Sequence, residues 1–254
     1  MKISLITFVP IAVMAMAVSA EPLTFGSGPR QVSLLELYTS EGCSSCPPAE
    51  AWLSGLKASS TLWTEVVPVA FHVDYWDYLG WRDPWAKSQY SDRQRAYAEL
   101  WHAVNSYTPE FILNGREWHR GFWPGNVPIS NAAHCGRLTV HSEDTQHWRL
   151  VFAPAPPQER IYEVHAALLV SGVGSEVKAG ENAGRQLKHD FAALAFTELP
   201  LLSRSNVFQA SFTLDGGVNQ TGGRLALAAW ITGREQSEVI QAVGGWLTNS
   251  AGSR

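Results

Sequence analysis

Two cysteines separated by two serines, Cys43-Ser44-Ser45-Cys46, are the residues of this chain whose types and spacing best suit chemistry. A pair with this spacing can close a disulfide and exchange it with other thiols. The pair follows an apolar run that ends at Tyr38. It precedes Pro47 and Pro48, which suit a first helical turn because that turn needs no intrahelical N–H group. We therefore expect both sulfurs on the first turn of a helix.

The start of a helix predicts different roles for the two cysteines. Unpaired backbone N–H groups and the positive end of the helix dipole favour a thiolate over a thiol at this position. We expect Cys43, the outermost of the two, to be the nucleophile. Cys46, one turn deeper, is expected to resolve a mixed disulfide formed on Cys43. The predicted activity is thiol–disulfide exchange with a protein or small-molecule substrate.

Three other interpretations of the cysteine pair stay open. An inert disulfide in a secreted scaffold is one, although the short loop that it closes removes little entropy from the unfolded chain. A zinc site completed by His134 and Cys135 is the second, although the sequence has no second CxxC pair. The third is capture of Cu(I) for delivery. The methionines all lie at the start of the chain, at positions 1, 14 and 16, so the rest of the chain has no thioether ligand for Cu(I), which disfavours this interpretation. Our prediction includes no resident metal or cofactor.

A second apolar run supplies candidates for proton transfer. Val66–Val73 predicts a buried strand, and the right-handed crossover rule places it parallel to Val32–Tyr38. Strand alternation puts His72 and Asp74 on one side, near the cysteine turn, where either group can accept a proton from the resolving thiol. Glu36 is a further candidate. A buried His and Asp that only bond to each other or to backbone would give the same pattern.

The first twenty residues predict a signal peptide. They contain Lys2, an apolar run from Leu5 to Val18, and the small-residue cleavage pattern Val18-Ser19-Ala20. We expect a periplasmic or secreted protein without stable membrane insertion, in a compartment where disulfides form. A net charge of −4 and the absence of a basic run argue against nucleic acid as a partner. The sequence leaves the oligomeric state open.

The middle of the chain predicts a helix, a hairpin and a connection. Ser91-Asp92-Arg93-Gln94 matches a capping box that opens a helix running to Val104. Phe111–Arg116 predicts a strand that ends in an Asn-Gly hairpin turn. A Gly/Pro-rich connection is expected at Gly121–Pro128, followed by a short helix at Ile129–Leu138 that carries the third cysteine as a packing residue.

From about Gln146 the pattern changes to short strands separated by turns rich in Pro, Gly and Asn, which suggests an antiparallel sandwich. The loop Gly180–Arg185 is expected to be a plain connection, with contact to the cysteine turn as the alternative. Ser237–Leu247 is expected to be a last strand, with an amphipathic helix as the alternative. The predicted strands before it are Trp148–Phe152, Ile161–Val170, Phe191–Phe196, Phe208–Leu214 and Leu225–Ile231.

The order of a CxxC helix start, a helical connection and a Thr108-Pro109 strand opening resembles the thioredoxin superfamily. That resemblance implies that Pro109 is cis and lies against the active sulfur, and that Thr108 presents its backbone to a substrate. Two positions depart from the thioredoxin pattern. Gly42 replaces a tryptophan, and Leu37 stands where thioredoxin has a buried acid.

More narrowly, several segments resemble the DUF1223 family of secreted bacterial proteins. The family implies a thioredoxin-like first domain and leaves substrate and reaction unassigned. We thus expect an α/β thioredoxin-like domain followed by an all-β antiparallel sandwich-like domain, with a signal peptide at 1–20 and domains at 21–145 and 146–254. The segments that carry the resemblance are Glu36–Pro48, His72–Asp77, Gly80–Pro84, Arg93–Tyr97 and Tyr107–Pro109.

Overall fold

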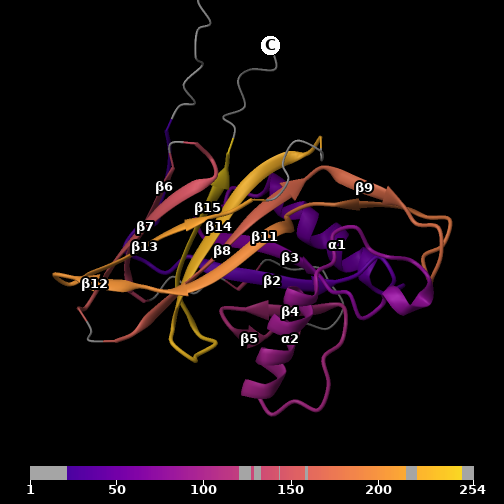
Figure 1. The fold of residues 1–254 in the computed structure, drawn as a ribbon, viewed down its shortest axis with the longest axis horizontal. Coiled ribbons are helices and arrows are strands. Elements are labelled where there is room, and N and C mark those ends of the chain that lie inside the picture. Colours follow the sequence, from indigo (N-terminus) through magenta and orange to yellow (C-terminus); the bar gives the residue numbers. More distant parts are fainter. Residues whose placement is uncertain are drawn as a thin grey trace, which may run out of the picture.

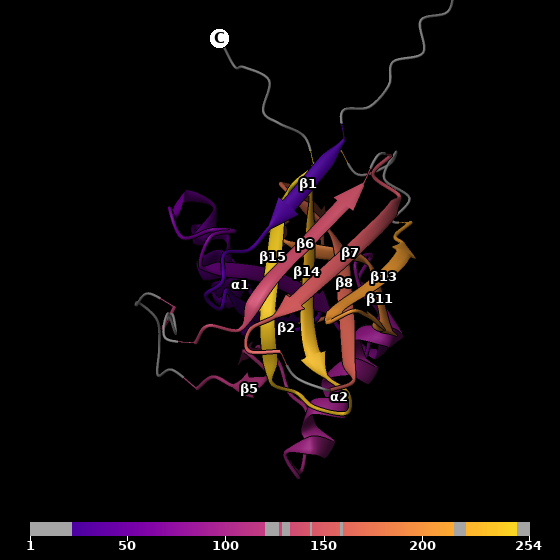
Figure 2. The same ribbon diagram turned by 90° about the vertical axis from the view of Figure 1, so that its left-hand side faces the viewer.

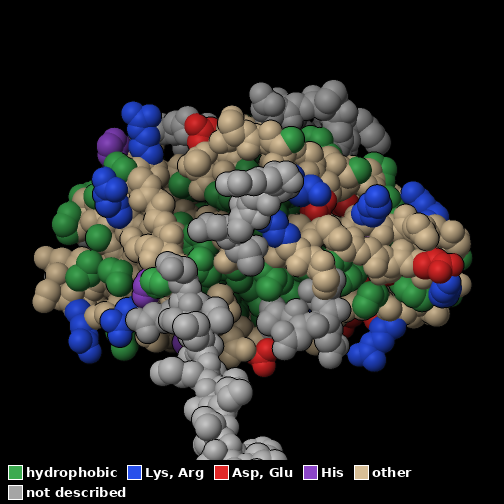
Figure 3. All heavy atoms as spheres, turned by 90° about the horizontal axis from the view of Figure 1, so that it is seen from above, with side chains coloured by type: hydrophobic (Ala, Val, Ile, Leu, Met, Phe, Trp, Pro, Cys, Tyr) green, Lys and Arg blue, Asp and Glu red, His purple; other side chains and the backbone are tan. Residues whose placement is uncertain are grey.

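The structure is a computed structural model that describes residues 22–119, 127–128, 133–142, 144–157, 160–215 and 222–247. The predicted signal peptide and most of the predicted Gly/Pro-rich connection lie outside these ranges. Within them, no helix is both long and apolar enough to cross a membrane. On the face seen in Figure 3, basic side chains are dispersed among polar and apolar ones.

Two regions lie side by side in Figure 1: a five-stranded sheet on the left, and the helices on the right beside β2, β3 and β4. An eight-stranded sheet of order β15-β14-β8-β11-β3-β2-β4-β5 runs through both regions. Figure 2 looks onto the five-stranded sheet, of order β1-β6-β7-β13-β12, with the large sheet behind it. Strands β9 and β10 form a separate two-stranded sheet.

The element bounds place the helices early in the chain and most strands late. The helical elements are α1 (Cys46–Gly55), α2 (Ser88–Leu100) and the 3-10 turns η1 (Leu56–Ala58) and η2 (Asp77–Leu79). The first strands are β1 (Leu23–Gly26), β2 (Ser33–Thr39), β3 (Val66–His72), β4 (Glu110–Leu113), β5 (Arg116–Glu117), β6 (Gly136–Ser142) and β7 (His147–Pro154). The others are β8 (Tyr162–Ser171), β9 (Val173–Glu176), β10 (Gln186–His189), β11 (Ala192–Pro200), β12 (Leu202–Arg204), β13 (Val207–Thr213), β14 (Arg224–Gly233) and β15 (Val239–Trp246).

Strands β2 and β3 are parallel and connected through α1, as the sequence predicted. Both strands are buried along their whole length, which is why they read as near-continuous apolar runs. Strand β4 pairs antiparallel with β2 and turns into β5 through Asn114 and Gly115, which have φ of 50° and 80°. A hairpin of this length needs positive φ at both turn positions, so the Asn-Gly prediction is confirmed.

The predicted fold class, an α/β thioredoxin-like domain followed by an all-β sandwich-like domain, is wrong. The chain is mostly sheet, with 47% strand and 14% helix and two α-helices in the described residues. Strand β11 pairs parallel with β3 through Ala192 and Ala70, so strands from beyond residue 145 extend the sheet that contains β2 and β3. An apolar strand pattern shows burial but not which sheet edge the strand joins, so the sequence missed this pairing.

Two helix predictions also need correction. Helix α2 begins at Ser88 with Lys87 as its N-cap residue, so Ser91 lies inside the first turn and caps nothing. The helix ends at Leu100, and Val104 is 93% exposed. Within the predicted helix Ile129–Leu138, the described residues from Gly136 onward belong to strand β6. The strands predicted after residue 146 are all present as β7, β8, β11, β13, β14 and β15.

Strands β8 and β14 are buried on both faces. In β14, Leu227 and Ile231 pack in the core shared with the five-stranded sheet, whereas Ala226 and Trp230 pack in the core that includes α1 and α2 residues. Burial on both faces makes the large sheet a rigid support. The cysteine turn projects from this support, between the end of β2 and the start of α1.

Candidate functional site

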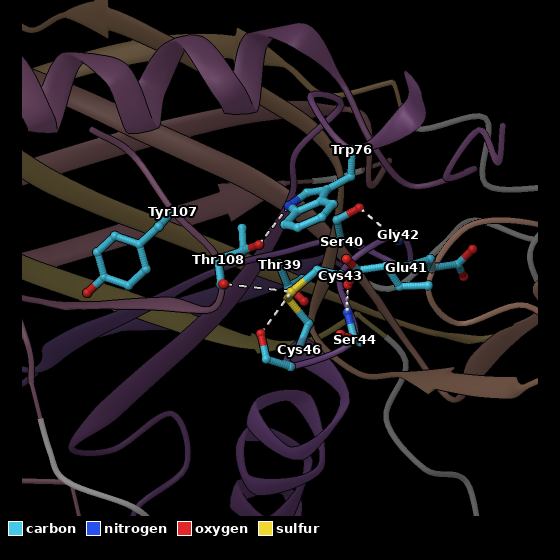
Figure 4. Close-up of a disulfide and its surroundings, with 12 residues drawn as sticks. Thr39, Ser40, Glu41, Gly42, Cys43, Ser44, Cys46, Trp76, Tyr107 and Thr108 are labelled. Atoms are coloured by element: carbon cyan, nitrogen blue, oxygen red, sulfur yellow. Dashed lines mark hydrogen bonds between the residues drawn. A yellow bond between two sulfur atoms is a disulfide. The ribbon is translucent and has the colours of Figure 1, made fainter. Parts of the chain in front are cut away.

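Cys43 and Cys46 form a disulfide at the start of α1, with their Cα atoms 5.5 Å apart (Figure 4). Ser45 is the N-cap residue of α1, and the intervening Ser44 and Ser45 are exposed. The cysteines themselves are 1% and 0% exposed. The sequence predicted Cys43 as the outermost cysteine, but in the oxidised pair both cysteines are buried, directly beneath an exposed turn.

Two groups contact the Cys43 sulfur, and a third, Trp76, holds one of them. Cys43 Sγ lies 3.3 Å from Ser45 Oγ and 3.7 Å from the carbonyl oxygen of Thr108. Trp76 lies in the segment between β3 and α2, residues 73–87, which we call the aromatic loop. Its Nε1 donates a hydrogen bond of 2.8 Å to Thr108 Oγ1 and so joins this loop to the Thr108 segment, as Figure 4 shows. A Cβ atom at Gly42 would lie 2.7 Å from Trp76 Cβ, so glycine is what lets the indole pack on the turn.

The Thr108–Pro109 peptide bond is cis, as the resemblance implied. The structure thus brings Thr108 to the disulfide with its backbone carbonyl toward Cys43. The aromatic loop packs over the same turn: Trp81 Nε1 donates 2.6 Å to Glu41 Oε2. The indoles of Trp76 and Trp81 therefore fasten this loop to the cysteine turn and to the Thr108 segment.

Five ionisable side chains lie buried at this end of the sheet, and we call them the acid–histidine cluster. Each is at most 6% exposed. They converge from the cysteine turn, helix α1, the end of β3, the aromatic loop and the end of β10. Their members are Glu41, Glu50, His72, Asp83 and His189.

His189 bridges two carboxylates of the cluster. Its Nε2 lies 2.8 Å from Glu41 Oε1, and its Nδ1 contacts Glu50 Oε2. Burial lowers the pKa of His189, but the two carboxylates outweigh burial and raise the pKa to about 10. Thr39 Oγ1 donates 2.6 Å to the other oxygen of Glu50. Burial raises the pKa of Glu50, but the hydrogen bond from His189 and the charge of His72 lower it to below its usual value.

His72 is bound on one side only. Its Nδ1 lies 2.8 Å from Asp83 Oδ2, an oxygen that also accepts the Glu41 backbone N–H at 2.8 Å. Burial raises the pKa of Asp83, but the charge of His72 outweighs this and the pKa falls below its usual range. His72 Nε2 is buried and has no hydrogen-bond partner among the described residues.

The other two predicted proton carriers lie elsewhere. Strand β3 ends at His72, so strand alternation does not extend to Asp74, whose Oδ1 accepts a 2.5 Å hydrogen bond from Ser91 Oγ on α2. Glu36 binds Arg93 Nε at 2.9 Å and Tyr97 Oη at 2.6 Å. Of the three candidates, the structure places His72 in the acid–histidine cluster.

The loop Gly180–Arg185 contacts the cysteine turn, so the expectation of a plain connection is wrong. The buried Asn182 side chain donates 2.8 Å hydrogen bonds to the carbonyl oxygens of Glu41 and Cys43. Ser44 N donates 2.9 Å to the Glu181 carboxylate. The loop between β9 and β10 therefore holds both ends of the turn.

A family model described as "Protein of unknown function (DUF1223)" matches residues 34–232. The chain belongs to this family. Among solved structures, it is similar to the protein AGR_C_4864 from Agrobacterium tumefaciens, at 19% identity and a TM-score of 0.57, covering 88% of this chain and 98% of that one. It is also similar to HBP35 of Porphyromonas gingivalis, at 12% identity and a TM-score of 0.59, covering 90% and 80%. Both likenesses concern the fold. No curated protein matches the chain.

Sequence reasoning missed most members of the acid–histidine cluster. Glu50 had a local signal, because it follows Cys46 by four residues on α1 and so lies on the same helix face. Glu41 had another, because it sits inside the cysteine turn. His189 and Asn182 had none, since only the folding of β9 and β10 brings them to the turn.

Cys135 is half-buried and free. Its Sγ lies 3.9 Å from the carbonyl oxygen of Pro29. Burial raises the pKa of the Cys135 thiol to about 11, which disfavours the nucleophilic thiolate. These observations agree with the predicted packing role for this cysteine.

Proposed function

We propose that the protein exchanges electrons with protein or small-molecule thiols through the Cys43–Cys46 pair. The observation that carries the proposal is a disulfide on the first turn of α1, beneath the exposed Ser44–Ser45 edge and beside the Thr108 carbonyl. A helix start favours thiolate, and the Thr108 backbone offers a visiting peptide a place to pair.

The reaction proceeds in two displacements. The Cys43 thiolate attacks one sulfur of a substrate disulfide, forms a mixed disulfide and releases the other substrate sulfur as a thiolate. Cys46 then loses its proton to water and attacks Cys43 Sγ, which closes the protein disulfide and releases the second substrate thiolate. Two electrons pass to the substrate, and its two thiolates take up protons from water. Oxidation of a substrate dithiol is the reverse. A role for His72 or Asp74 in the proton steps stays a prediction.

The exchange requires access to a covered sulfur. Ser45 and the Thr108 segment cover Cys43, and the Trp76–Thr108 hydrogen bond holds that cover in place. An attacking thiolate must approach Cys43 Sγ along the S–S axis. We therefore expect the Trp76–Thr108 hydrogen bond to open before exchange. Export to an oxidising compartment, which the sequence predicts, is part of the proposal because a pair that oxidises substrate dithiols must be reoxidised there.

An inert structural disulfide is the second candidate, and the burial of both cysteines is the observation that favours it. A structural disulfide resists reduction by thiol pools, whereas a working one is reduced and reformed. The two functions therefore differ in reactivity rather than in the presence of the bond.

Single cysteine variants test the proposal. Cys43→Ser is expected to abolish dithiol turnover, and Cys46→Ser is expected to trap a covalent adduct on Cys43 that mass spectrometry detects. Cys135→Ser is the matched control and should retain turnover, because its thiol is not part of the pair. If Cys43→Ser retains turnover and Cys46→Ser traps nothing, the proposal is wrong.

A further inference from the structure

Three side chains of the acid–histidine cluster have the types and spacing of metal ligands. One ligand atom each from Glu50, His72 and His189 lies within 4.8 Å of the others, and all three residues are buried. Imidazole nitrogens and carboxylate oxygens are the ligands that Zn²⁺ accepts beside thiolate, and two histidines with one glutamate recur at zinc centres. None of the three is a cysteine, so this group is separate from the disulfide.

His72 is already oriented as a ligand. With its Nδ1–H donating to Asp83, the ring in its neutral form carries its lone pair on Nε2, and this is the form in which a histidine binds a metal. That lone pair is buried and has no hydrogen-bond partner in the described part of the chain. A buried polar atom without a partner destabilises the fold, and a bound cation would remove this penalty. Metal-bound histidines almost always give their other ring nitrogen to a carboxylate or a carbonyl, as His72 does here.

His189 also gives one ring nitrogen to a carboxylate that would orient it, and its other nitrogen is bonded to a second ligand of the group. Its Nε2 lies 2.8 Å from Glu41, and its Nδ1 faces Glu50. A cation can take the place of the proton shared between His189 Nδ1 and the Glu50 carboxylate, and that proton then leaves to solvent. Glu41 would continue to hold the ring, and it is itself fixed by Trp81 Nε1.

The third ligand is held as firmly. Glu50 Oε1 accepts the Thr39 hydroxyl at 2.6 Å, so the orientation of the carboxylate is set before any ion arrives. Asp83, which orients His72, is fixed by the backbone N–H groups of Glu41 and Trp85. Each ligand therefore has a second group that positions it, which is the construction that tight metal sites use.

We propose that Glu50, His72 and His189 bind one divalent transition-metal ion of the Zn²⁺ class, with Asp83 and Glu41 as positioning residues. Three protein ligands leave one position of a tetrahedral site open to water or another small ligand. The site uses neither Cys43 nor Cys46, so it stands whether or not the disulfide turns over.

Cobalt titration tests the proposal, because tetrahedral Co²⁺ absorbs visible light. The chelator-treated full chain is expected to bind Co²⁺ at one ion per chain, with an absorption that Zn²⁺ displaces. His72→Phe should lower the affinity by at least about 100-fold, and Asp83→Asn by about 10–100-fold, since each removes a ligand or its orienting group. His134→Ala, at an exposed histidine, and the double variant Cys43→Ser, Cys46→Ser should bind as the parent does.

Circular dichroism separates loss of the site from loss of the fold. If His72→Phe does not fold, the folded Asp83→Asn variant decides the matter by its affinity. Absence of one-to-one binding by the parent chain would overturn the proposal. Unchanged affinity in Asp83→Asn, or loss of binding in the double cysteine variant, would overturn it as well.

Discussion

Two groups of ionisable side chains, all buried or nearly so except Glu198, flank β2 and β3, and they differ in how completely their members are paired. One is the acid–histidine cluster beside the disulfide. The other, which we call the arginine cluster, surrounds the Arg93 guanidinium. Its members are Glu36, Arg93, Tyr97, His165 and Glu198.

The arginine cluster is saturated. The Arg93 guanidinium contacts Glu36, Tyr97 and His165 through three different nitrogens, and aromatic rings lie over it at centroid distances of 5.1 to 5.9 Å. Burial lowers the pKa of Arg93, but the charge of Glu36 raises it to above its usual value, so the charge is permanent. A fixed, fully bonded charge stabilises the packing around it and has little left to offer a ligand.

Among the described residues, the acid–histidine cluster keeps one imidazole nitrogen unpaired, and it lies next to the Cys43–Cys46 disulfide. Unsatisfied buried groups are rare in folded proteins and concentrate where a ligand or a reaction satisfies them. The comparison teaches that burial of charge alone does not mark a site in this molecule. Within the described residues, the acid–histidine cluster differs from the arginine cluster in its unpaired imidazole nitrogen and in the disulfide beside it.

The largest expected effect comes from the arginine cluster. Arg93→Met leaves the Glu36 carboxylate buried without its cation, and we expect a loss of about 3–5 kcal/mol in the free energy of unfolding. Urea unfolding of oxidised protein measures this loss. Arg95→Met, at an exposed position on the same helix, is the control and should change stability by less than about 1 kcal/mol. Equal losses of unfolding free energy in Arg93→Met and Arg95→Met would show that the buried arginine contributes no more to stability than the exposed one.

A smaller effect is expected at the loop that holds the cysteine turn. Asn182→Ala leaves the carbonyl oxygens of Glu41 and Cys43 without their donor, which should cost about 1–3 kcal/mol and speed reduction of the disulfide by dithiothreitol. Stopped-flow reduction and urea unfolding measure the two quantities. The exposed Asn105→Ala, at a position without positive φ, serves as control for asparagine removal. An Asn182 variant with parental stability and parental reduction rate would show that the loop does not hold the turn.

The third prediction contrasts Glu36 with Glu110, a buried carboxyl whose bonded neighbour is the neutral Gln94. Burial raises the pKa of Glu110 to about 7, and the charges of Glu117 and Glu36 add to this. Because the folded pKa lies above the unfolded one, the stability from neutral Glu110 is complete below about pH 4.5 and disappears as pH rises through 7.

Glu110→Gln removes that dependence. At pH 7.5 we expect this variant to be more stable than the parent by about 1–2 kcal/mol, and at pH 4.5 the two should be nearly equal. Urea midpoints at the two pH values provide the measurement. A variant that is less stable than the parent at pH 7.5 would mean that Glu110 is ionised and paired in the folded protein.

Local patterns predicted the elements around the disulfide and failed on how distant segments meet. The apolar runs, the paired prolines and the Asn-Gly turn each report on a few neighbouring residues, and β2, α1, β3 and the β4–β5 hairpin followed from them. The Ala70–Ala192 pairing that overturned the fold class joins segments far apart in the chain. The sequence pattern of neither segment indicates which strand it pairs with.

The same limit applies to the site. Cys43, Cys46 and Thr108 were predicted, and the structure brings them together. His189 and Asn182 arrive through the β9–β10 hairpin, and their sequence surroundings show only a polar loop. Their contribution depends on hydrogen bonds that only the folded chain makes, from Asn182 to the cysteine turn and from His189 to Glu41.

The reduction potential of the Cys43–Cys46 pair tests the central claim most directly. Equilibration of the Cys135→Ser variant with glutathione and dithiothreitol buffers, followed by alkylation and mass spectrometry, gives this potential without interference from the third thiol. The account predicts a reversible two-electron transition between about −270 and −120 mV, the range of working dithiols. A potential below about −300 mV would identify a structural disulfide and contradict the proposed exchange.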